Sequence, residues 1–126
     1  MNMKAWKIIH RFMAAYNERD LEKFIGFMHP EFTSYLFESQ HCLCSDIEDA
    51  RKIYRKRFKE NKKLFVTTLN RMVNDNVVVE SQVIEGFDKG KTIHAIAIFE
   101  LQNDKVKRAS FVRREIHTTE SLSVLM

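Results

Sequence analysis

The chain has 126 residues, with 21 lysines and arginines against 17 aspartates and glutamates, which gives a formal net charge of +4. Hydrophobic residues make up 44% of the chain and charged residues 30%, a balance typical of one globular domain and not of a disordered or fibrous protein. Only three glycines are present, so the glycine-rich phosphate loops of nucleotide-binding proteins are excluded.

Compartment and membrane association are constrained by composition and by the cysteines. Apolar runs such as Val77–Val79 and Ala95–Phe99 are far shorter than the roughly 20 residues that cross a bilayer. The first fifteen residues interleave charged with apolar side chains, so no signal-peptide core is expected. Cys42 and Cys44 are separated by one residue, which disfavours an unstrained disulfide and suits a reducing compartment. We therefore predict a cytoplasmic protein without membrane association.

Helical periodicity dominates the beginning of the chain. Apolar side chains recur at the spacing of one helical stripe, at Trp6, Ile9, Phe12, Met13 and Tyr16. After a break at Asn17–Asp20, Asp20 is a candidate N-cap for a short second helix. That helix is expected to turn four side chains inward, Leu21, Phe24, Ile25 and Met28. Pro30 is predicted to end it.

A strand and a capped helix are expected next. Residues Phe32–Glu38 are rich in aromatic and β-favouring side chains and predict the first strand. The Ser-Asp-Ile-Glu stretch at residues 45–48 matches a capping box, in which Ser45 Oγ accepts from the Glu48 amide and the Glu48 carboxylate accepts from the Ser45 amide. The helix is predicted to run to about residue 61, with one apolar face formed by Ile47, Ala50, Ile53, Tyr54 and Phe58.

The hydrophobic period changes from 3.6 to 2 after this helix. Four long strands are predicted, at Leu64–Val73, Val77–Phe87, Lys91–Gln102 and Lys105–His117. Their short connections are rich in turn-forming residues, as antiparallel hairpins require. Helices followed by such a meander predict an α+β domain with the helices on one face of the sheet. Ten phenylalanines exceed what a flat core of this kind needs, so we expect a strongly curved sheet around a conical cavity.

The third strand of the meander is apolar on both faces. One face carries Ile93, Ala95, Ala97 and Phe99, and the other carries Ile96 and Ile98 beside His94 and Glu100. An antiparallel sheet with one face in water should alternate with polar residues instead. Because no further helix is left to cover the second face, we predict a homodimer that packs through the outer sheet faces.

The stretch from Phe12 to Phe32, with its Asn-x-x-Asp-Leu break after the first helix, is similar to the opening of the NTF2-like superfamily. The capped helix and the segment from Phe99 to Arg108 resemble the rest of that superfamily, so the resemblance covers about residues 3–115. It implies a cone-shaped fold with an apolar pocket between the first helices and the concave sheet, usually in a dimer. We therefore place a single NTF2-like domain at residues 1–117 and a C-terminal tail at residues 118–126.

The superfamily includes ketosteroid isomerase, SnoaL-like polyketide cyclases, scytalone dehydratase and members that only bind or associate. The resemblance puts the catalytic positions of the isomerase on unsuitable side chains, namely Phe12, Leu36–Phe37 and either Ala97 or Ile98. Only a supporting tyrosine finds its match, at Tyr54. Proton transfer next to a carbonyl needs a positioned base and an oxyanion donor, so steroid isomerase activity is not expected.

Aromatic and polar side chains that could line the pocket are the candidate binding residues. They are Phe12, Tyr16, Tyr35, Phe37, Tyr54, Phe99 and Arg113, with Glu80 or Ser81 as a further polar group. Phenol hydroxyls on an apolar wall can orient a ligand, although each tyrosine alone fits a half-buried core aromatic better. The cluster of three tyrosines is stronger evidence for a binding site than any one of them. The candidate catalytic residues are Tyr54 and His94. His94 shares a face with Ile96 and would become a general base only if the faces of the strand were exchanged.

The remaining motifs favour ordinary structural roles. The His-Cys-Leu-Cys stretch at residues 41–44 suggests zinc, but no second cluster supplies the other ligands, so neither a metal nor another cofactor is expected. Residues 51–63 carry eight positive charges against Glu60 alone, a pattern of a nucleic-acid surface or of a solvated helix face. No stacking aromatics accompany these charges, so nucleic-acid binding is not expected.

Two functions follow from these features. The first is a SnoaL-like domain that binds a small, largely apolar molecule in its cone, with minor isomerase, cyclase or dehydratase activity as an option. The alternative is a non-catalytic dimeric interaction module that binds an acidic partner through its basic helix.

Overall fold

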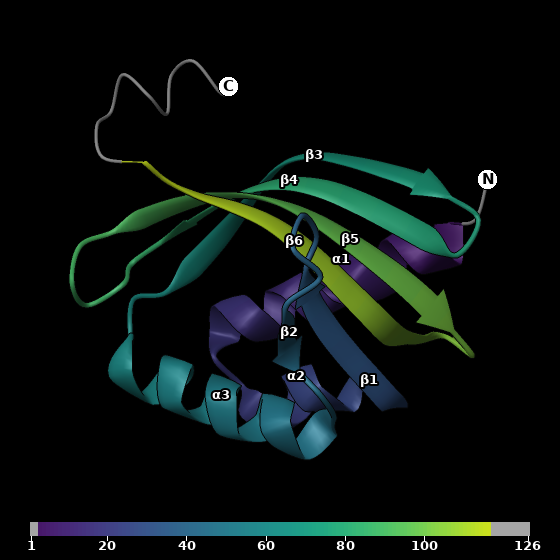
Figure 1. Cartoon of the computed structure of the whole chain (residues 1–126), viewed down its shortest axis with the longest axis horizontal. Coiled ribbons are helices and arrows are strands. Elements are labelled where there is room, and N and C mark those ends of the chain that lie inside the picture. Colours follow the sequence, from purple (N-terminus) through teal and green to yellow (C-terminus); the bar gives the residue numbers. More distant parts are fainter. Residues whose placement is uncertain (1–2, 117–126) are drawn as a thin grey trace.

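The computed structural model describes residues 3–116 and contains three helices and one six-stranded sheet in that range. In chain order the elements are α1 (Met3–Glu18), α2 (Leu21–Gly26), β1 (Met28–Leu36), β2 (Cys42–Cys44), α3 (Ile47–Glu60), β3 (Phe65–Asn74), β4 (Val77–Glu85), β5 (Thr92–Gln102) and β6 (Lys105–Ile116). The sheet curls around the helices, which all lie on its concave side (Figure 1). The predicted α+β architecture with a strongly curved, mainly antiparallel sheet is confirmed.

The strands lie in the order β2-β1-β6-β5-β4-β3. The four predicted meander strands are present, and β3 to β6 pair with their chain neighbours in antiparallel register. Asp75, Asn103 and Asp104 in the two tightest connections have positive φ, which short polar side chains tolerate better than most. β1 pairs in parallel with β6, so the N-terminal part of the chain completes the sheet beside its C-terminal strand. The predicted tail at residues 118–126 lies outside the described residues.

The Asn-x-x-Asp-Leu break holds α1 to the edge of the sheet and starts α2. The side-chain amide of Asn17 donates to Val66 O at 3.0 Å, and its oxygen accepts from Val66 N at 2.7 Å. The guanidinium of Arg19 donates to Leu64 O at 2.7 Å. Asp20 is the N-cap of α2, as predicted, and accepts from the Lys23 amide. The motif therefore gives hydrogen-bond partners to buried backbone groups at and just before the start of edge strand β3.

The start of α3 is displaced by one residue from the predicted capping box. Asp46 is the N-cap and accepts from the Asp49 amide at 2.7 Å. The Asp49 carboxylate reaches back to the Ser45 amide at 3.0 Å, so Asp49 takes the place predicted for Glu48. Two capping patterns overlap in this stretch, one formed by Ser45 with Glu48 and the other by Asp46 with Asp49, and the second is the one present. The Glu48 carboxylate instead lies 3.6 Å from Arg51 Nε.

The first strand begins earlier than predicted, and a short strand was missed. Met28 belongs to β1 and not to the second helix, which ends at Gly26. Pro30 lies within β1, where the register to β6 shifts between Met28 and Thr33, so its missing N–H removes no ladder hydrogen bond. The segment predicted as a loop contains β2, which pairs with β1 at Ser34 and Tyr35. Its two cysteines are free thiols, Cys42 exposed and Cys44 buried.

Aromatic rings join the helices to the concave face of the sheet. Phe12 of α1 stacks on Phe24 of α2, with ring centroids 4.4 Å apart, and meets the edge of Phe99 of β5 at 5.8 Å. Tyr16 and Tyr54 extend this cluster toward α3, with centroids 6.3 Å apart. Within residues 3–116, no helix combines the length and the apolar character needed to span a membrane.

Candidate functional site

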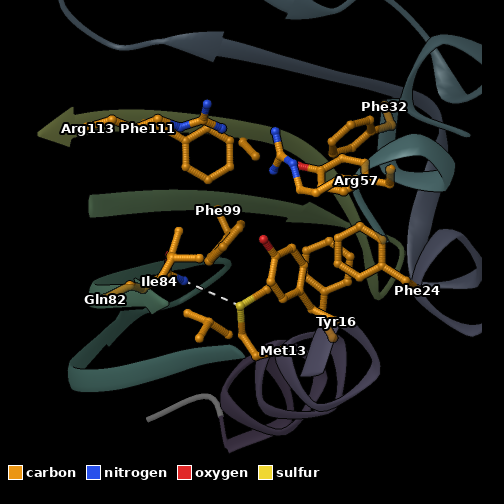
Figure 2. Close-up of a pocket in the computed structure, with 14 residues that line it drawn as sticks. Met13, Tyr16, Phe24, Phe32, Arg57, Gln82, Ile84, Phe99, Phe111 and Arg113 are labelled. Carbon is orange, nitrogen blue, oxygen red and sulfur yellow. Dashed lines mark hydrogen bonds between the residues drawn. The ribbon is translucent and has the colours of Figure 1, made fainter. Parts of the chain in front are cut away.

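A small cavity lies between α1, α3 and the concave face of the sheet, at the point where the aromatic cluster meets β4, β5 and β6 (Figure 2). Its volume is about 40 Å³. The residues that line it are Phe12, Met13, Tyr16, Phe24, Phe32, Tyr54, Arg57, Val66, Gln82, Ile84, Phe99, Ala109, Phe111 and Arg113. The wall is therefore mainly aromatic and aliphatic, with a few hydrogen-bonding groups, as in many small-molecule sites.

Tyr16 presents a hydroxyl to this cavity without a partner. Its side chain is only 5% exposed, and among the described residues its Oη is the buried side-chain polar atom that makes no hydrogen bond. Burial raises the pKa of Tyr16 to about 12, an effect that the nearby Arg57 guanidinium partly offsets. The hydroxyl is thus protonated at neutral pH and available as a donor. Buried polar groups without partners are rare in folded proteins.

Two arginines reach the same cavity from different elements. Arg57 comes from α3 and Arg113 from β6, and their guanidinium groups extend toward one another (Figure 2). Arg57 lies over the Tyr54 ring, 4.9 Å from its centroid, and Arg113 lies over the Phe111 ring at the same distance. Both side chains are half-buried. Burial is the main cause that lowers the pKa of Arg113 below its ordinary value, and repulsion from Arg57 lowers it further.

The structure brings five of the seven predicted binding residues together. Phe12, Tyr16, Tyr54, Phe99 and Arg113 all line the cavity.

Tyr35 and Phe37 do not line this cavity. Because Phe32 points to the concave side, alternation along β1 turns Tyr35 outward. The ring of Tyr35 packs under the Arg108 guanidinium at 4.2 Å, and Phe37 lies beyond the end of β1 with 49% of its side chain exposed.

His94 lies on the outer face of the sheet, opposite Val83 and away from the cavity. Its Nε2 is 3.1 Å from Ser81 Oγ, which shares that face. Burial lowers the pKa of His94. The candidate general base is therefore not placed where it could act on a molecule in the cavity.

Glu80 points to the concave side but is already bound by its neighbours. It is fully buried, and its carboxylate accepts from Arg71 Nε at 2.5 Å and from Gln82 Nε2 at 2.8 Å. Gln82 also contacts the sulfur of Met13 at 3.3 Å, the interaction drawn as a dashed line in Figure 2. Glu80 thus supports the cavity wall through Gln82 and does not itself line the cavity.

Arg57 and Gln82 are the polar lining residues that the sequence interpretation missed. The charge pattern predicts Arg57 among the solvated charges of the basic helix. It lies three residues after Tyr54 and beside Phe58, so helical spacing puts it next to the apolar stripe, and this spacing was the signal that could have identified it. Gln82 and Ile84 are two residues apart in β4, so the alternation of a strand by itself predicts that they share one face, while Ser81 lies on the other.

The chemistry available in this cavity is hydrogen-bond donation and cation recognition of an anion, set in aromatic walls. Neither a carboxylate nor an imidazole is among the described residues that line it. The arrangement can therefore orient a ligand, but it offers no side chain of ordinary general-base type.

Comparisons with known proteins agree on fold and family. No curated protein sequence matches the chain. Among solved structures, an uncharacterised cystatin-fold protein from Novosphingobium aromaticivorans matches with a TM-score of 0.79 at 15% identity, over 86% of this chain and 97% of that one. A proposed ketosteroid isomerase from Kribbella flavida matches with a TM-score of 0.78 at 11% identity, over 92% and 82%. An NTF2-like protein of unknown function from Cytophaga hutchinsonii matches with a TM-score of 0.72 at 15% identity, over 87% and 89%.

Identities this low establish the shared fold and nothing about substrates. The sequence itself carries a stronger assignment, because residues 9–109 match the SnoaL-like domain. This range includes α2 and α3, most of α1, and the strands up to the middle of β6. The predicted NTF2-like resemblance is confirmed, and the chain belongs to the SnoaL-like domain family of the NTF2-like superfamily.

Proposed function

We propose that this SnoaL-like domain binds a small, largely apolar molecule in the cavity beneath its curved sheet. The observation that carries this proposal is the protonated, unpartnered hydroxyl of Tyr16 at an otherwise aromatic cavity wall. A ligand acceptor would satisfy this donor, while the rings of Phe12 and Phe99 would supply apolar contact area.

The volume of the cavity limits what can be enclosed. A water molecule needs about 10–15 Å³ of such space, so the cavity holds roughly three water-sized groups. Typical sites for drug-sized ligands measure about 300–1,000 Å³. We therefore propose that only a fragment of the ligand is enclosed, or that the flexible side chains of Met13 and Arg57 move outward when a larger molecule binds.

Any isomerase, cyclase or dehydratase chemistry in this cavity would depend on its phenols. Tyr54 and Tyr16 could donate a proton or hydrogen bond to a substrate oxygen, whereas no carboxylate among the described lining residues could accept one. The proposed activity is accordingly binding, with Tyr54 as the candidate catalytic residue if turnover is found.

The proposal is tested by titrating ¹⁵N-labelled protein with neutral aromatic probes, benzamide and benzyl alcohol, and following the amide resonances by NMR. We expect shift changes confined to α1, α3 and the concave side of β4–β6. Ile84→Phe fills the cavity wall and should abolish these shifts, whereas Lys56→Phe, which adds the same ring to the exposed face of α3, should leave them intact. Equal shifts in wild type and Ile84→Phe would show that the probes bind elsewhere.

The competing function uses the exposed face of α3. Lys52, Arg55, Lys56 and Lys59 are exposed there, while Arg51 is paired with Glu22 and Arg57 turns toward the cavity. An acidic protein or nucleic acid bound by this face would show affinity that falls steeply with salt. Salt-dependent retention of RNA or DNA in a filter-binding series, without probe binding in the cavity, would favour this alternative.

We also propose a homodimer through the outer sheet face. Val79, Ile96, Ile98 and Val112 are half-exposed there, and Met72 is 61% exposed. The alternation of the strands places these side chains together, and a second copy of the same apolar face is a self-complementary cover for them.

The dimer is expected to elute in size-exclusion chromatography with light scattering at twice the 15.0 kDa mass of the chain. Ile98→Asp should shift it to the monomer, because a charge would then be buried at the centre of the interface. Lys56→Asp on the exposed face of α3 is the control and should remain dimeric. A wild-type monomer at every concentration tested overturns the proposal.

A further inference from the structure

The pair of arginines at the cavity lacks the anions that such groups normally have. Arg57 and Arg113 each carry a full charge and five N–H donors, yet within residues 3–116 neither takes part in any of the ion pairs. Each guanidinium instead stacks on an aromatic ring, Arg57 on Tyr54 and Arg113 on Phe111. Stacking on a ring satisfies the flat face of a guanidinium and leaves its N–H edge unused.

The two guanidinium groups of this pair have different surroundings. Burial opposes the charge of Arg57, but the neighbouring Tyr54 and Tyr16 raise its pKa overall, whereas the charge of Arg113 is disfavoured. Two like charges, each half-buried, extend toward one another at the wall of a mainly apolar cavity (Figure 2). The pKa of Arg113 is lowered mainly by burial and also by repulsion from Arg57. Removing charges from water without pairing them destabilises a protein, so an arrangement of this kind is best explained by an anion that binds there.

The hydroxyl of Tyr16, which lies close enough to Arg57 to affect its pKa, provides the second indication. It is buried and protonated, and it opens on the same cavity without a hydrogen-bond partner. A donor hydroxyl and two guanidinium groups all require acceptor oxygens, and the described lining residues supply no carboxylate.

We propose that the bound molecule is an apolar carboxylic acid whose carboxylate lies between Arg57, Arg113 and the Tyr16 hydroxyl. This inference rests on the proposed function. The N–H edges of the two guanidinium groups hold the carboxylate oxygens, and the Tyr16 hydroxyl donates to one of them. The hydrocarbon part of the acid lies against the aromatic walls.

The space available favours a carboxylate over a phosphate. A carboxylate is planar, carries one charge and has three non-hydrogen atoms, which suits a cavity of about 40 Å³. A phosphate group is tetrahedral and has five, and its higher charge would be poorly solvated against walls made of Phe99, Phe111 and Ile84. Phosphate is therefore included as a test compound and is expected to bind more weakly.

The experiment compares isosteric acids and amides by NMR titration at neutral pH, using acetate with acetamide and benzoate with benzamide, and inorganic phosphate alone. We expect each acid to bind about tenfold or more tightly than its amide, since hydrogen bonds to a charged group are stronger than neutral ones. The side-chain Nε–H resonances of Arg57 and Arg113 should shift with the acids and not with the amides.

Variants distinguish the effect of the two arginines on the acid preference from the effect of positive charge elsewhere on the surface. Arg113→Met and Arg57→Met should each remove the preference for the acid while keeping the apolar stem and the binding of benzamide. Lys56→Met removes the same charge from the exposed face of α3 and should leave the preference unchanged. Tyr16→Phe should weaken both acid and amide.

The outcomes distinguish this inference from the proposed function on which it rests. Binding of benzamide and benzoate with equal affinity overturns the carboxylate preference and leaves small-molecule binding in place. Binding of neither compound overturns both. Tighter binding of phosphate than of benzoate overturns the preference for a carboxylate, and loss of the preference in Lys56→Met attributes it to surface charge instead.

Discussion

Replacing Glu80 with alanine is expected to destabilise the protein by about 3–5 kcal/mol, because a buried ion pair loses one partner and leaves the other unpaired. Glu80 is fully buried, and the Arg71 side chain that it binds is only 9% exposed. The same carboxylate also accepts from Gln82 and, at 3.4 Å, from Thr68. The free energy of unfolding, measured by urea denaturation of wild type and Glu80→Ala, checks this expectation.

The double variant Arg71→Met with Glu80→Met is the informative control. Two apolar side chains of similar size replace both charges, so most of the lost stability should return. The Glu80→Gln variant keeps the shape but not the charge and should fall between wild type and Glu80→Ala. A loss below about 1 kcal/mol in Glu80→Ala would show that the pair is solvated, contrary to its burial.

Gly86→Ala is expected to lower the free energy of unfolding by about 2–5 kcal/mol through two additive effects. Gly86 has φ of +84°, where an alanine costs about 1–2 kcal/mol. A Cβ at this position would also lie 1.9 Å from the carbonyl oxygen of Lys63, so the backbone before β3 must move away, at a cost of about 1–3 kcal/mol. For a domain of this size we expect the melting temperature to fall by about 10–20 °C.

Gly90→Ala separates the two effects within the same β4–β5 connection. Gly90 has φ of +77°, nearly that of Gly86, but apart from its chain neighbours no atom of residues 3–116 lies within 4 Å of the Cβ that alanine would add. Its cost should be the backbone strain alone, about 1–2 kcal/mol. Equal losses for the two variants in the same thermal melts would mean that the close approach to Lys63 is relieved without cost.

The hydrophobic periodicity of the sequence and its turn-forming residues predicted most of the fold. The long helices and the four meander strands follow from patterns that extend over ten or more residues, where single errors average out. β2 has only three residues and follows a loop with Gln40 at positive φ, so neither its length nor its composition distinguishes it from a turn. Pro30 was read as the end of a helix, although a strand with an irregular register also tolerates proline.

The candidate site was less predictable because its composition depends on single side-chain directions. Tyr35 was assigned to the cavity for its chemistry, although alternation with Phe32 places it on the outer side. Arg57 was assigned to the surface for its charge, although the spacing from Tyr54 places it inside. In both cases the geometry of the strand or helix, and not the residue type, decides where the side chain lies.

The parallel pairing of β1 with β6 sets the order in which the chain can assemble. β1 precedes α3 and the whole meander, yet its main neighbour is β6, the last of the described strands to be synthesised. A nascent chain on the ribosome therefore cannot join β1 and β2 to the sheet until β6 has emerged, even though the hairpins from β3 to β5 can form earlier. Contacts this distant in sequence slow folding, and a growing chain must keep the apolar side of β1 shielded during translation.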